Sequence, residues 1–205
     1  MQLVLFDFDG TLTRRDSLSD FLWFALGPWP LVAGLPRIGI RLLRLWGQGH
    51  WSNGAAKRVV LDVYFGGWPK TVLDKTAAEW TERRLPTLLR AEVLDRLRRY
   101  RAAGNQVVVV SASIDLWLMP FCEQEQVALL CTALAYRDGR FFGDFQTPNC
   151  NGPEKAVRIK AAYDLTAYAH IVAFGNSAGD RAMFALAQEV WFYGRHGLVP
   201  HFKNI

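Results

Sequence analysis

Short, almost wholly apolar runs recur along the chain and predict buried strands. They cover residues 2–8, 106–110, 170–174 and 190–193, and each of the first three ends in small polar residues followed by a helical stretch. A continuous apolar run bounded by a turn signal is typical of a strand buried on both faces, as in a parallel sheet. The pattern predicts an α/β fold with a doubly wound, mostly parallel sheet, whose ligands bind beyond the carboxyl ends of the strands.

The long segment between the first and second runs lacks strand alternation and predicts helices. These cover residues 18–26, 31–46, 52–65, 69–85 and 87–103. The last helix is expected to return to the sheet, and the others form an insertion that is too large for a loop. We therefore predict an α/β core formed by residues 1–15 and 86–205, with a helical cap formed by residues 16–85 inserted after the first strand.

Two local signals complete the predicted elements. Asp138-Gly139, flanked by residues 133–136 and 140–145, predicts a β-hairpin. A further helix is expected to begin after Gly152 and to end near Tyr163, because Pro153 suits a first helical turn.

Composition excludes several classes of protein. Hydrophobic residues make up 51% of the 205 residues and charged residues 21%, which excludes a disordered tail, a collagen-like repeat and a pure coiled coil. The net charge of +5 is local, since residues 21–61 contain no acidic residue. That segment holds Arg37, Arg41, Arg44, Lys57 and Arg58. Because the charge forms neither a long stripe nor a repeated basic motif, no nucleic-acid partner is expected.

Cysteine usage and the N-terminal segment bear on location. Cys122, Cys131 and Cys150 are too few and too scattered for a disulfide framework or a zinc site, and an odd count is typical of reduced thiols in a cytosolic protein. The chain opens without a basic leader, so no secretory signal is expected. Residues 21–36 form an uncharged run shorter than the about 20 apolar residues of a spanning helix. We expect a cytoplasmic protein, with peripheral contact to the inner face of the membrane left open.

The residues that carry chemistry begin at the end of the first strand. Asp7 and Asp9 lie two residues apart on an extended backbone, so both side chains would point to the same side, and Gly10 allows a sharp turn. Two carboxylates at the carboxyl end of a strand can hold Mg²⁺ while one attacks and the other transfers a proton. The alternative interpretation is a surface Asp-Gly turn.

Polar residues also follow the later strands. Ser111 offers a hydroxyl and neighbouring N–H groups where a phosphate would bind, although it could equally cap the next helix. Lys155 lies near a helix start, where a cation is unfavourable without an anionic partner; an exposed lysine is the alternative. Asp180, in the loop after the third strand, is expected to face the carboxylates of the first strand, or else to belong to an ordinary loop with a helix N-cap.

These segments resemble the four ordered motifs of the haloacid-dehalogenase-like superfamily. The resembling residues are 7–11, Ser111, Gly152 with Lys155, and 175–180, and their order and spacing span the whole chain. A helical insertion directly after the first motif resembles the phosphoserine-phosphatase-like branch, the subclass IB phosphatases. Ser111-Ala112-Ser113 and residues 147–150 are similar to the broad bacterial phosphatases of that branch. The dehalogenases of the superfamily lack the second aspartate, so Asp9 favours phosphate chemistry.

The resemblance implies a Mg²⁺-dependent phosphatase that hydrolyses phosphate monoesters through an aspartyl-phosphate intermediate. Asp7 is then the nucleophile and Asp9 the general acid and base, with Ser111 and Lys155 as further catalytic residues. The implied phosphate-binding residues are Thr11, Ser111, Ala112 and Lys155. The implied metal ligands are Asp7, Asp9, Asn176 and Asp180. Asn176 stands where the family usually has a metal-binding aspartate, so whether Asn176 or Asp180 ligates the metal directly stays open.

One cap helix has an unusual pattern. Arg37, Arg41 and Arg44 are spaced i, i+4 and i+7 and would form one face of the helix. Another arc holds Leu31, Leu35, Ile38, Leu42 and Leu45, with Trp46 and Trp51 beyond it. A basic amphipathic helix with tryptophans is typical of membrane-surface binding or of a clamp for an acidic ligand. The alternative is an ordinary lid helix whose apolar face packs inside the insertion.

Two classes of function therefore stand. The first is a phosphatase acting on a small phosphorylated metabolite or on a lipid headgroup, such as phosphatidylglycerophosphate at the membrane surface. The second is a non-catalytic phosphate-binding or regulatory module, which Asn176 suggests and which intact Asp7 and Asp9 oppose. The sequence does not identify the substrate, the physiological role or the oligomeric state.

Overall fold

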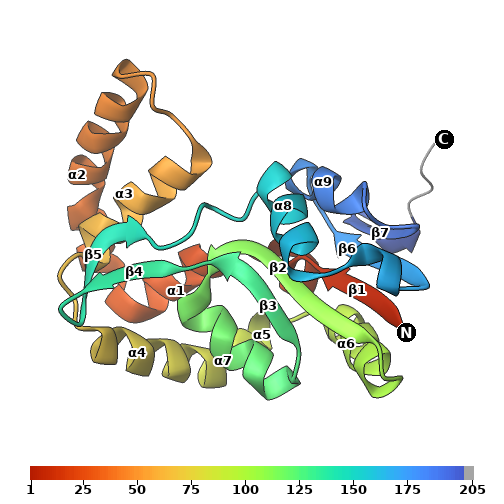
Figure 1. Ribbon diagram of the computed structural model, residues 1–205. Helices are drawn as coiled ribbons and strands as arrows, with labels where there is room; N and C mark the ends of the chain where they lie inside the picture. The colour runs from red at the N-terminus through yellow and green to blue at the C-terminus, as the bar shows by residue number, and fades with distance from the viewer. Residues whose placement is uncertain (201–205) are drawn as a thin grey trace.

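The fold is built around one mixed β-sheet with helices on both faces (Figure 1). The computed structural model describes residues 1–200. The sheet consists of β1 (Gln2–Phe6), β2 (Gln106–Ile114), β3 (Ala128–Thr132), β6 (His170–Gly175), β7 (Glu189–Gly194) and β8 (Gly197–Pro200). Its order is β3-β2-β1-β6-β7-β8, and every pair is parallel except β7 with β8. The predicted mostly parallel α/β sheet is confirmed; β3 and β8 were not predicted.

The helices also follow the predicted order. The bounds are α1 (Ser17–Leu26), α2 (Pro28–Gly47), α3 (Asn53–Phe65), α4 (Lys70–Arg83), α5 (Leu85–Leu88), α6 (Ala91–Ala102), α7 (Asp115–Glu125), α8 (Pro153–Ala162) and α9 (Arg181–Phe184). The helix predicted over residues 87–103 begins later, because Leu89 and Arg90 have extended backbone angles that separate α5 from α6.

The central strand β1 is apolar throughout because both of its faces are covered. Val4 and Phe6 lie in the core that the sheet shares with α6 and α7, whereas Leu3 and Leu5 lie in the core beneath α8 and α9. Phe6 stands in register with β2 and β6, so the carboxyl ends of the three strands meet at one edge of the sheet. The residues that follow each strand are thereby brought together.

The predicted hairpin is present and lies beside the helical insertion. Strands β4 (Leu134–Arg137) and β5 (Arg140–Phe145) pair antiparallel, and both turn residues have positive φ, 49° for Asp138 and 71° for Gly139. Lys70 N donates to the carbonyl of Gly139, which ties the start of α4 to the turn. The hairpin therefore supports the insertion from below α3 (Figure 1).

The helical insertion makes two kinds of contact with the core. Helices α1 and α4 pack on α7 through an aromatic cluster, in which the Phe21 and Trp117 rings stack with centroids 4.8 Å apart and Trp80 contacts both. Helices α2 and α3 project further from the sheet (Figure 1). The division of the chain at residues 15 and 85 stays a prediction, and the last five residues of the predicted core, 201–205, lie outside the described residues.

Helix α2 departs from its predicted pattern in two respects. Leu35, a member of the predicted apolar arc, is 58% exposed, because α3 covers only one side of α2. Arg41 pairs with Asp62 of α3 at 2.6 Å, whereas Arg37 and Arg44 have no ion-pair partner within residues 1–200. None of the helices described is by itself long and apolar enough to cross a membrane; α1 and α2 meet that criterion only as a pair, with a bend of 118° between them.

Candidate active site

Asp7 lies directly after β1, at the edge where the parallel strands end. Its backbone N–H donates to the carbonyl of Phe174 at 2.9 Å, which continues the pairing with β6. Its carboxylate is buried, with Lys155 Nζ 2.6 Å from Oδ1 and Thr11 Oγ1 2.9 Å from Oδ2. Burial raises the pKa of Asp7 to about 6, against the opposing effect of Lys155. The surface-turn alternative for this segment is therefore wrong.

Lys155 joins Asp7 to Asp180 through a buried ion-pair network. It projects from the first turn of α8, is 2% exposed, and places Nζ 2.6 Å from Asp7 and 2.7 Å from Asp180. Burial by itself would lower the pKa of Lys155, but the two carboxylates hold it above its usual value, so the amine stays charged. The alternative of an exposed lysine is wrong, and the anionic partners expected at this helix start are Asp7 and Asp180.

Both carboxylate oxygens of Asp180 accept hydrogen bonds from neighbouring residues. Oδ1 accepts from Lys155, and Oδ2 accepts from the backbone N–H groups of Asn176 and Ser177 at 3.1 and 3.0 Å. Ser177 and Asp180 also cap each other's backbone in the short helical turn that follows β6. Asp180 therefore faces the first-strand carboxylate through Lys155 and holds the loop that carries Asn176.

The side chain of Asn176 lies against Gly10. A Cβ built on Gly10 would stand only 2.0 Å from Asn176 Nδ2, and Gly10 has a φ of +78°, which L side chains rarely adopt. No residue within 1–200 hydrogen-bonds to the Asn176 side-chain amide. Its oxygen is therefore available to a ligand beside the Asp7–Thr11 turn.

Asp9 is held by the core and by the first helix of the insertion together. Ser113 Oγ donates to Asp9 Oδ2 at 2.5 Å, and Ser17 N donates to Oδ1 at 2.7 Å. Ser17 Oγ lies 2.9 Å from Ser113 Oγ and accepts from Trp117 Nε1 at 3.0 Å. Burial raises the pKa of Asp9, and the bonds from Ser113 and Ser17 oppose that rise. Sequence reasoning missed Ser17, because its position before an apolar helix has no local signature.

Ser111 and Ala112 lie within the last part of β2. Ser111 is buried, and its Oγ accepts from Ser113 N at 3.0 Å. It does not cap the next helix, as the alternative interpretation held, because α7 begins only at Asp115. The carbonyl of Ala112 accepts from Thr132 Oγ1 at 3.0 Å and from Lys57 Nζ at 2.5 Å. These bonds fix the backbone that follows the valine run.

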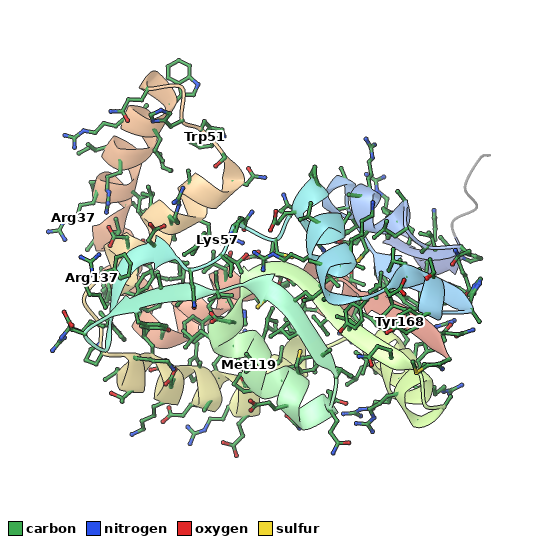
Figure 2. The ribbon with its side chains drawn as sticks, viewed as in Figure 1. Arg37, Trp51, Lys57, Met119, Arg137 and Tyr168 are labelled. Atoms are coloured by element: carbon green, nitrogen blue, oxygen red, sulfur yellow. The ribbon has the colours of Figure 1, made fainter. Side chains whose placement is uncertain are left out.

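Lys57 brings a cation from α3 to the same edge of the sheet (Figure 2). Its Nζ also lies 3.4 Å from Asn149 Oδ1. Burial lowers the pKa of Lys57, while Asp9 and Asp16 act in the opposite direction. Asn149 also lines a polar cavity of about 640 Å³ between the start of α3 and residues 144–151. From the sequence, Lys57 was assigned only to the basic segment of residues 21–61, because no local pattern indicates that it belongs to the site.

The carboxylate and amide oxygens at this edge of the sheet are ligands of the kind that a hard divalent cation prefers. Asp7, Asp9 and Asp180 supply three carboxyl groups at this edge of the sheet, and Lys155 forms ion pairs with two of them, Asp7 and Asp180. Within residues 1–200, however, no three acidic, histidine or cysteine side chains gather as a metal site. The oxygens of Asp7 and Asn176, completed by backbone and water as Mg²⁺ commonly allows, fit the ion. Asp9 and Asp180, also predicted as ligands, use both carboxylate oxygens in hydrogen bonds to protein, and so does Asp7. Of the four predicted ligands, Asn176 is the one whose side-chain oxygen has no hydrogen-bond partner within residues 1–200.

Comparison with known proteins bears directly on this geometry. Residues 4–185 match the family model of the haloacid dehalogenase-like hydrolases. The chain belongs to this family. Protein CicA of Caulobacter vibrioides is 34% identical over 194 residues, which cover 91% of this chain and 83% of that protein. The family predicted from the sequence is thus confirmed.

Solved structures show the same fold for this haloacid dehalogenase-like hydrolase. A Bordetella pertussis protein of unknown function aligns with a TM-score of 0.75 and 23% identity, over 92% of this chain and 88% of its own. A phosphoserine phosphatase, solved as a phospho-aspartyl intermediate analogue, aligns with a TM-score of 0.63 and 19% identity, over 92% and 84% of the two chains. The chain therefore shares its fold with a phosphoserine phosphatase.

In this haloacid dehalogenase-like hydrolase, the predicted motif residues converge to different degrees. Lys155 contacts both Asp7 and Asp180, and Thr11 contacts Asp7. Asp9 reaches the Ser111 segment through Ser113, while the Asn176 side chain lies beside Gly10 of the first motif. The catalytic, phosphate-binding and metal-binding roles given to these residues stay predictions.

Proposed function

We propose that this protein is a Mg²⁺-dependent phosphatase that hydrolyses phosphate monoesters through an aspartyl-phosphate on Asp7. The observation that carries the proposal is the pairing of a buried Asp7, fixed by Lys155 and Thr11, with a second carboxylate, Asp9, fixed separately by Ser113 and Ser17. In this proposal one carboxylate attacks phosphorus and the other exchanges a proton. Membership of a hydrolase family supports the assignment.

The proposed reaction has two steps, formation of the phosphoenzyme and its hydrolysis, and Asp9 transfers the proton in both. A carboxylate oxygen of Asp7 attacks phosphorus, the bond from phosphorus to the ester oxygen breaks, and Asp9 gives its proton to the leaving alkoxide. Asp9 then takes a proton from water as the water oxygen attacks phosphorus. The bond from phosphorus to Asp7 breaks, which releases inorganic phosphate and restores both side chains.

Lys155 stabilises the reacting groups by its position. Its charged amine keeps Asp7 ionised despite burial, and Thr11 Oγ1 orients the second carboxylate oxygen. Ser111 and the N–H of Ala112, at the adjacent strand end, are assigned to the phosphate oxygens. Asp7 and Asn176 would hold Mg²⁺, which would supply positive charge to neutralise the phosphoryl group.

The leaving group is expected on the side of the insertion. Lys57 reaches the site from α3, and the polar cavity next to Asn149 gives room for a group attached to the phosphate. A phosphate monoester is the chemistry that a small metabolite and a lipid headgroup share. A substrate screen therefore contains both kinds of ester, the lipid esters being presented in detergent micelles.

The test is phosphate release from that panel with Mg²⁺ and with a chelator, combined with trapping of the phosphoenzyme. We expect Mg²⁺-dependent turnover and a hydroxylamine-sensitive phosphate on a peptide that contains Asp7. Asp7→Asn should abolish both, because an amide forms no acyl phosphate. Asp9→Asn should slow release by about 10²–10⁴-fold and most of all for poor leaving groups. Phosphate binding without turnover on any ester would instead support the non-catalytic module.

A further inference from the structure

Large exposed hydrophobic side chains concentrate on one part of the molecule. Of the fourteen that are exposed within residues 1–200, eight lie between residues 23 and 51, on α1, α2 and the loop before α3. These are Trp23, Trp29, Val32, Leu35, Ile40, Leu43, Trp46 and Trp51. Exposed apolar side chains that gather in one part of a protein commonly mark a surface that binds a partner.

Helix α2 has two apolar faces, of which only one is covered. On the inner face, Gly34 and Ile38 are buried, and Tyr64 of α3 donates its hydroxyl to the carbonyl of Leu31 at 2.6 Å. The opposite face presents an outer stripe, defined here as Trp29, Val32, Pro36, Ile40 and Leu43, in which every residue is exposed. A surface helix with one buried face normally turns polar residues outward, so the outer stripe is not explained by packing.

Unpaired positive charge borders the outer stripe. Arg37 and Arg44 are exposed and have no ion-pair partner within the described residues, and Arg37 points away from the molecule (Figure 2). Arg41, the third arginine of the helix, is neutralised by Asp62. Residues 21–61 themselves contain no acidic residue, so Arg37 and Arg44 leave uncompensated positive charge beside the stripe.

A second copy of this chain is a poor occupant of this surface. A two-fold interface places the same patch against itself, so the two copies of Arg37 and Arg44 would approach each other with no acidic residue of α2 to pair with them. An anionic lipid surface supplies both the negative charge and the apolar environment that this surface of α2 requires. The lipid phosphates can pair with the arginine side chains, and the acyl chains can bury the apolar residues of the outer stripe. Tryptophan side chains favour the interface between the headgroups and the acyl chains.

We propose that the outer stripe of α2 docks on the surface of an anionic lipid bilayer, with Arg37 and Arg44 at the lipid phosphates. The helix lies in the plane of the interface, with Trp29 and Trp46 near its two ends in the headgroup region. The inner face stays packed on α3 during docking. The proposal concerns binding alone and does not depend on the proposed phosphatase activity.

The test is cosedimentation of the full chain with vesicles. Vesicles of phosphatidylglycerol and phosphatidylcholine should pellet the protein at low salt, whereas vesicles of phosphatidylcholine alone should bind it much more weakly. Added salt should release it, because the Debye length falls from about 30 Å at 0.01 M to about 3 Å at 1 M. Bound protein should also show a blue shift of tryptophan fluorescence.

Two sets of variants separate the contributions of charge and of apolar surface. Replacing Arg37 and Arg44 by Gln should lower the partition coefficient roughly 25-fold, since each basic residue near the surface contributes about fivefold. Val32→Ser with Ile40→Ser and Leu43→Ser should lower it at least about 10-fold through lost apolar burial. The matched controls are Arg83→Gln with Lys75→Gln on α4, and Val72→Ser with Met119→Ser on α4 and α7, all of which are exposed.

Circular dichroism and urea unfolding identify any variant that does not fold. The arginine variants change exposed side chains only, so they test the proposal even if the apolar variants fail to fold. Wild-type protein that stays in the supernatant with anionic vesicles at low salt would overturn the proposal. Binding that the α2 variants and the controls reduce equally would place the contact elsewhere and overturn it as well. A dimer in sedimentation equilibrium that the apolar variants dissociate, without vesicle binding, would assign the stripe to self-association instead.

Discussion

Ser113 Oγ lies 2.5 Å from Asp9 Oδ2, although 104 residues separate the two along the chain. Ser113 belongs to the end of β2, and its hydroxyl is in turn 2.9 Å from Ser17 Oγ at the start of α1. The proposed proton carrier is therefore oriented by the sheet and by the insertion at the same time. A shift of α1 relative to the sheet would change the hydrogen bonds of Asp9 directly.

Ser113→Ala is expected to move the pH dependence of turnover to higher pH. The Ser113 hydrogen bond stabilises the ionised form of Asp9 and opposes the rise in pKa that burial causes, so its removal raises the pKa further. Asp9 then keeps the proton for the leaving group at a higher pH. The pH profile of kcat with an alkyl phosphate measures the shift. Ser113→Thr, which retains the hydroxyl, should restore the wild-type profile, and an unchanged profile in Ser113→Ala would contradict the assigned contact.

Lys155→Met is expected to cost about 3–5 kcal/mol of stability near neutral pH, because it leaves buried carboxylates without a cation. Without Lys155, burial raises the pKa of Asp7 above its value of about 6 and well above that of the unfolded chain. The folded state then binds protons that the unfolded state releases, so the loss should shrink as the pH falls toward about 5. Urea unfolding with a chelator present measures this. Lys160→Met, at an exposed position of α8, is the control.

Gly10→Ala is expected to damage the site more than the fold. Gly10 has a φ of +78°, and the new Cβ would stand 2.0 Å from Asn176 Nδ2, so the amide must move. Gly104→Ala is the matched control, since Gly104 has a φ of +76° and nothing within 4 Å of an added Cβ. Backbone strain should lower the free energy of unfolding of both variants by about 1–2 kcal/mol. Only Gly10→Ala should lose Mg²⁺ affinity and turnover; an equal loss in both would refute a role for the Gly10–Asn176 contact.

Asn176→Asp is expected to increase affinity for Mg²⁺ on the order of 10-fold, because a charged oxygen ligand binds a hard cation better than an amide does. Isothermal titration calorimetry of Mg²⁺ binding measures the change without reference to turnover. Gln124→Glu on α7 adds the same charge at an exposed position away from the site and should leave the affinity unchanged. Unchanged affinity in Asn176→Asp would remove Asn176 from the metal ligands.

Lys57→Met is expected to raise KM about 10- to 100-fold, with a smaller effect on kcat, because a hydrogen bond to a charged group typically contributes about 1.5–3 kcal/mol. Lys57 reaches the site from the insertion and contacts Ala112 O rather than Asp7, so it should affect binding more than chemistry. Steady-state kinetics on the ester panel separates the two constants. Lys75→Met, exposed on α4, should change neither; a fall in kcat with KM unchanged would place Lys57 in the chemical step.

Much of the fold could be predicted because its signals are local. The apolar runs before Asp7 and Ser111 predicted strands, and turn residues such as Asp138-Gly139 marked the hairpin. Strands β3 and β8 escaped prediction because they are short, five and four residues long, and form the two edges of the sheet. Parallel strands place their carboxyl ends together, so the approach of Asp180 to Asp7 could be predicted. Lys155 reaches both carboxylates from the first turn of α8.

The sequence by itself determined which residues follow each strand, because buried strands and sharp turns depend on neighbouring residues. It also indicated that α2 is helical, with basic residues on one side and an apolar arc on another. Only the tertiary structure decided which of those sides is covered, since α3 lies against one of them and leaves Leu35 and the outer stripe exposed. It also decided that Lys57 and Ser17 belong to the site, because packing of the insertion on the sheet, and not any local pattern, brings them to Ala112 and Asp9.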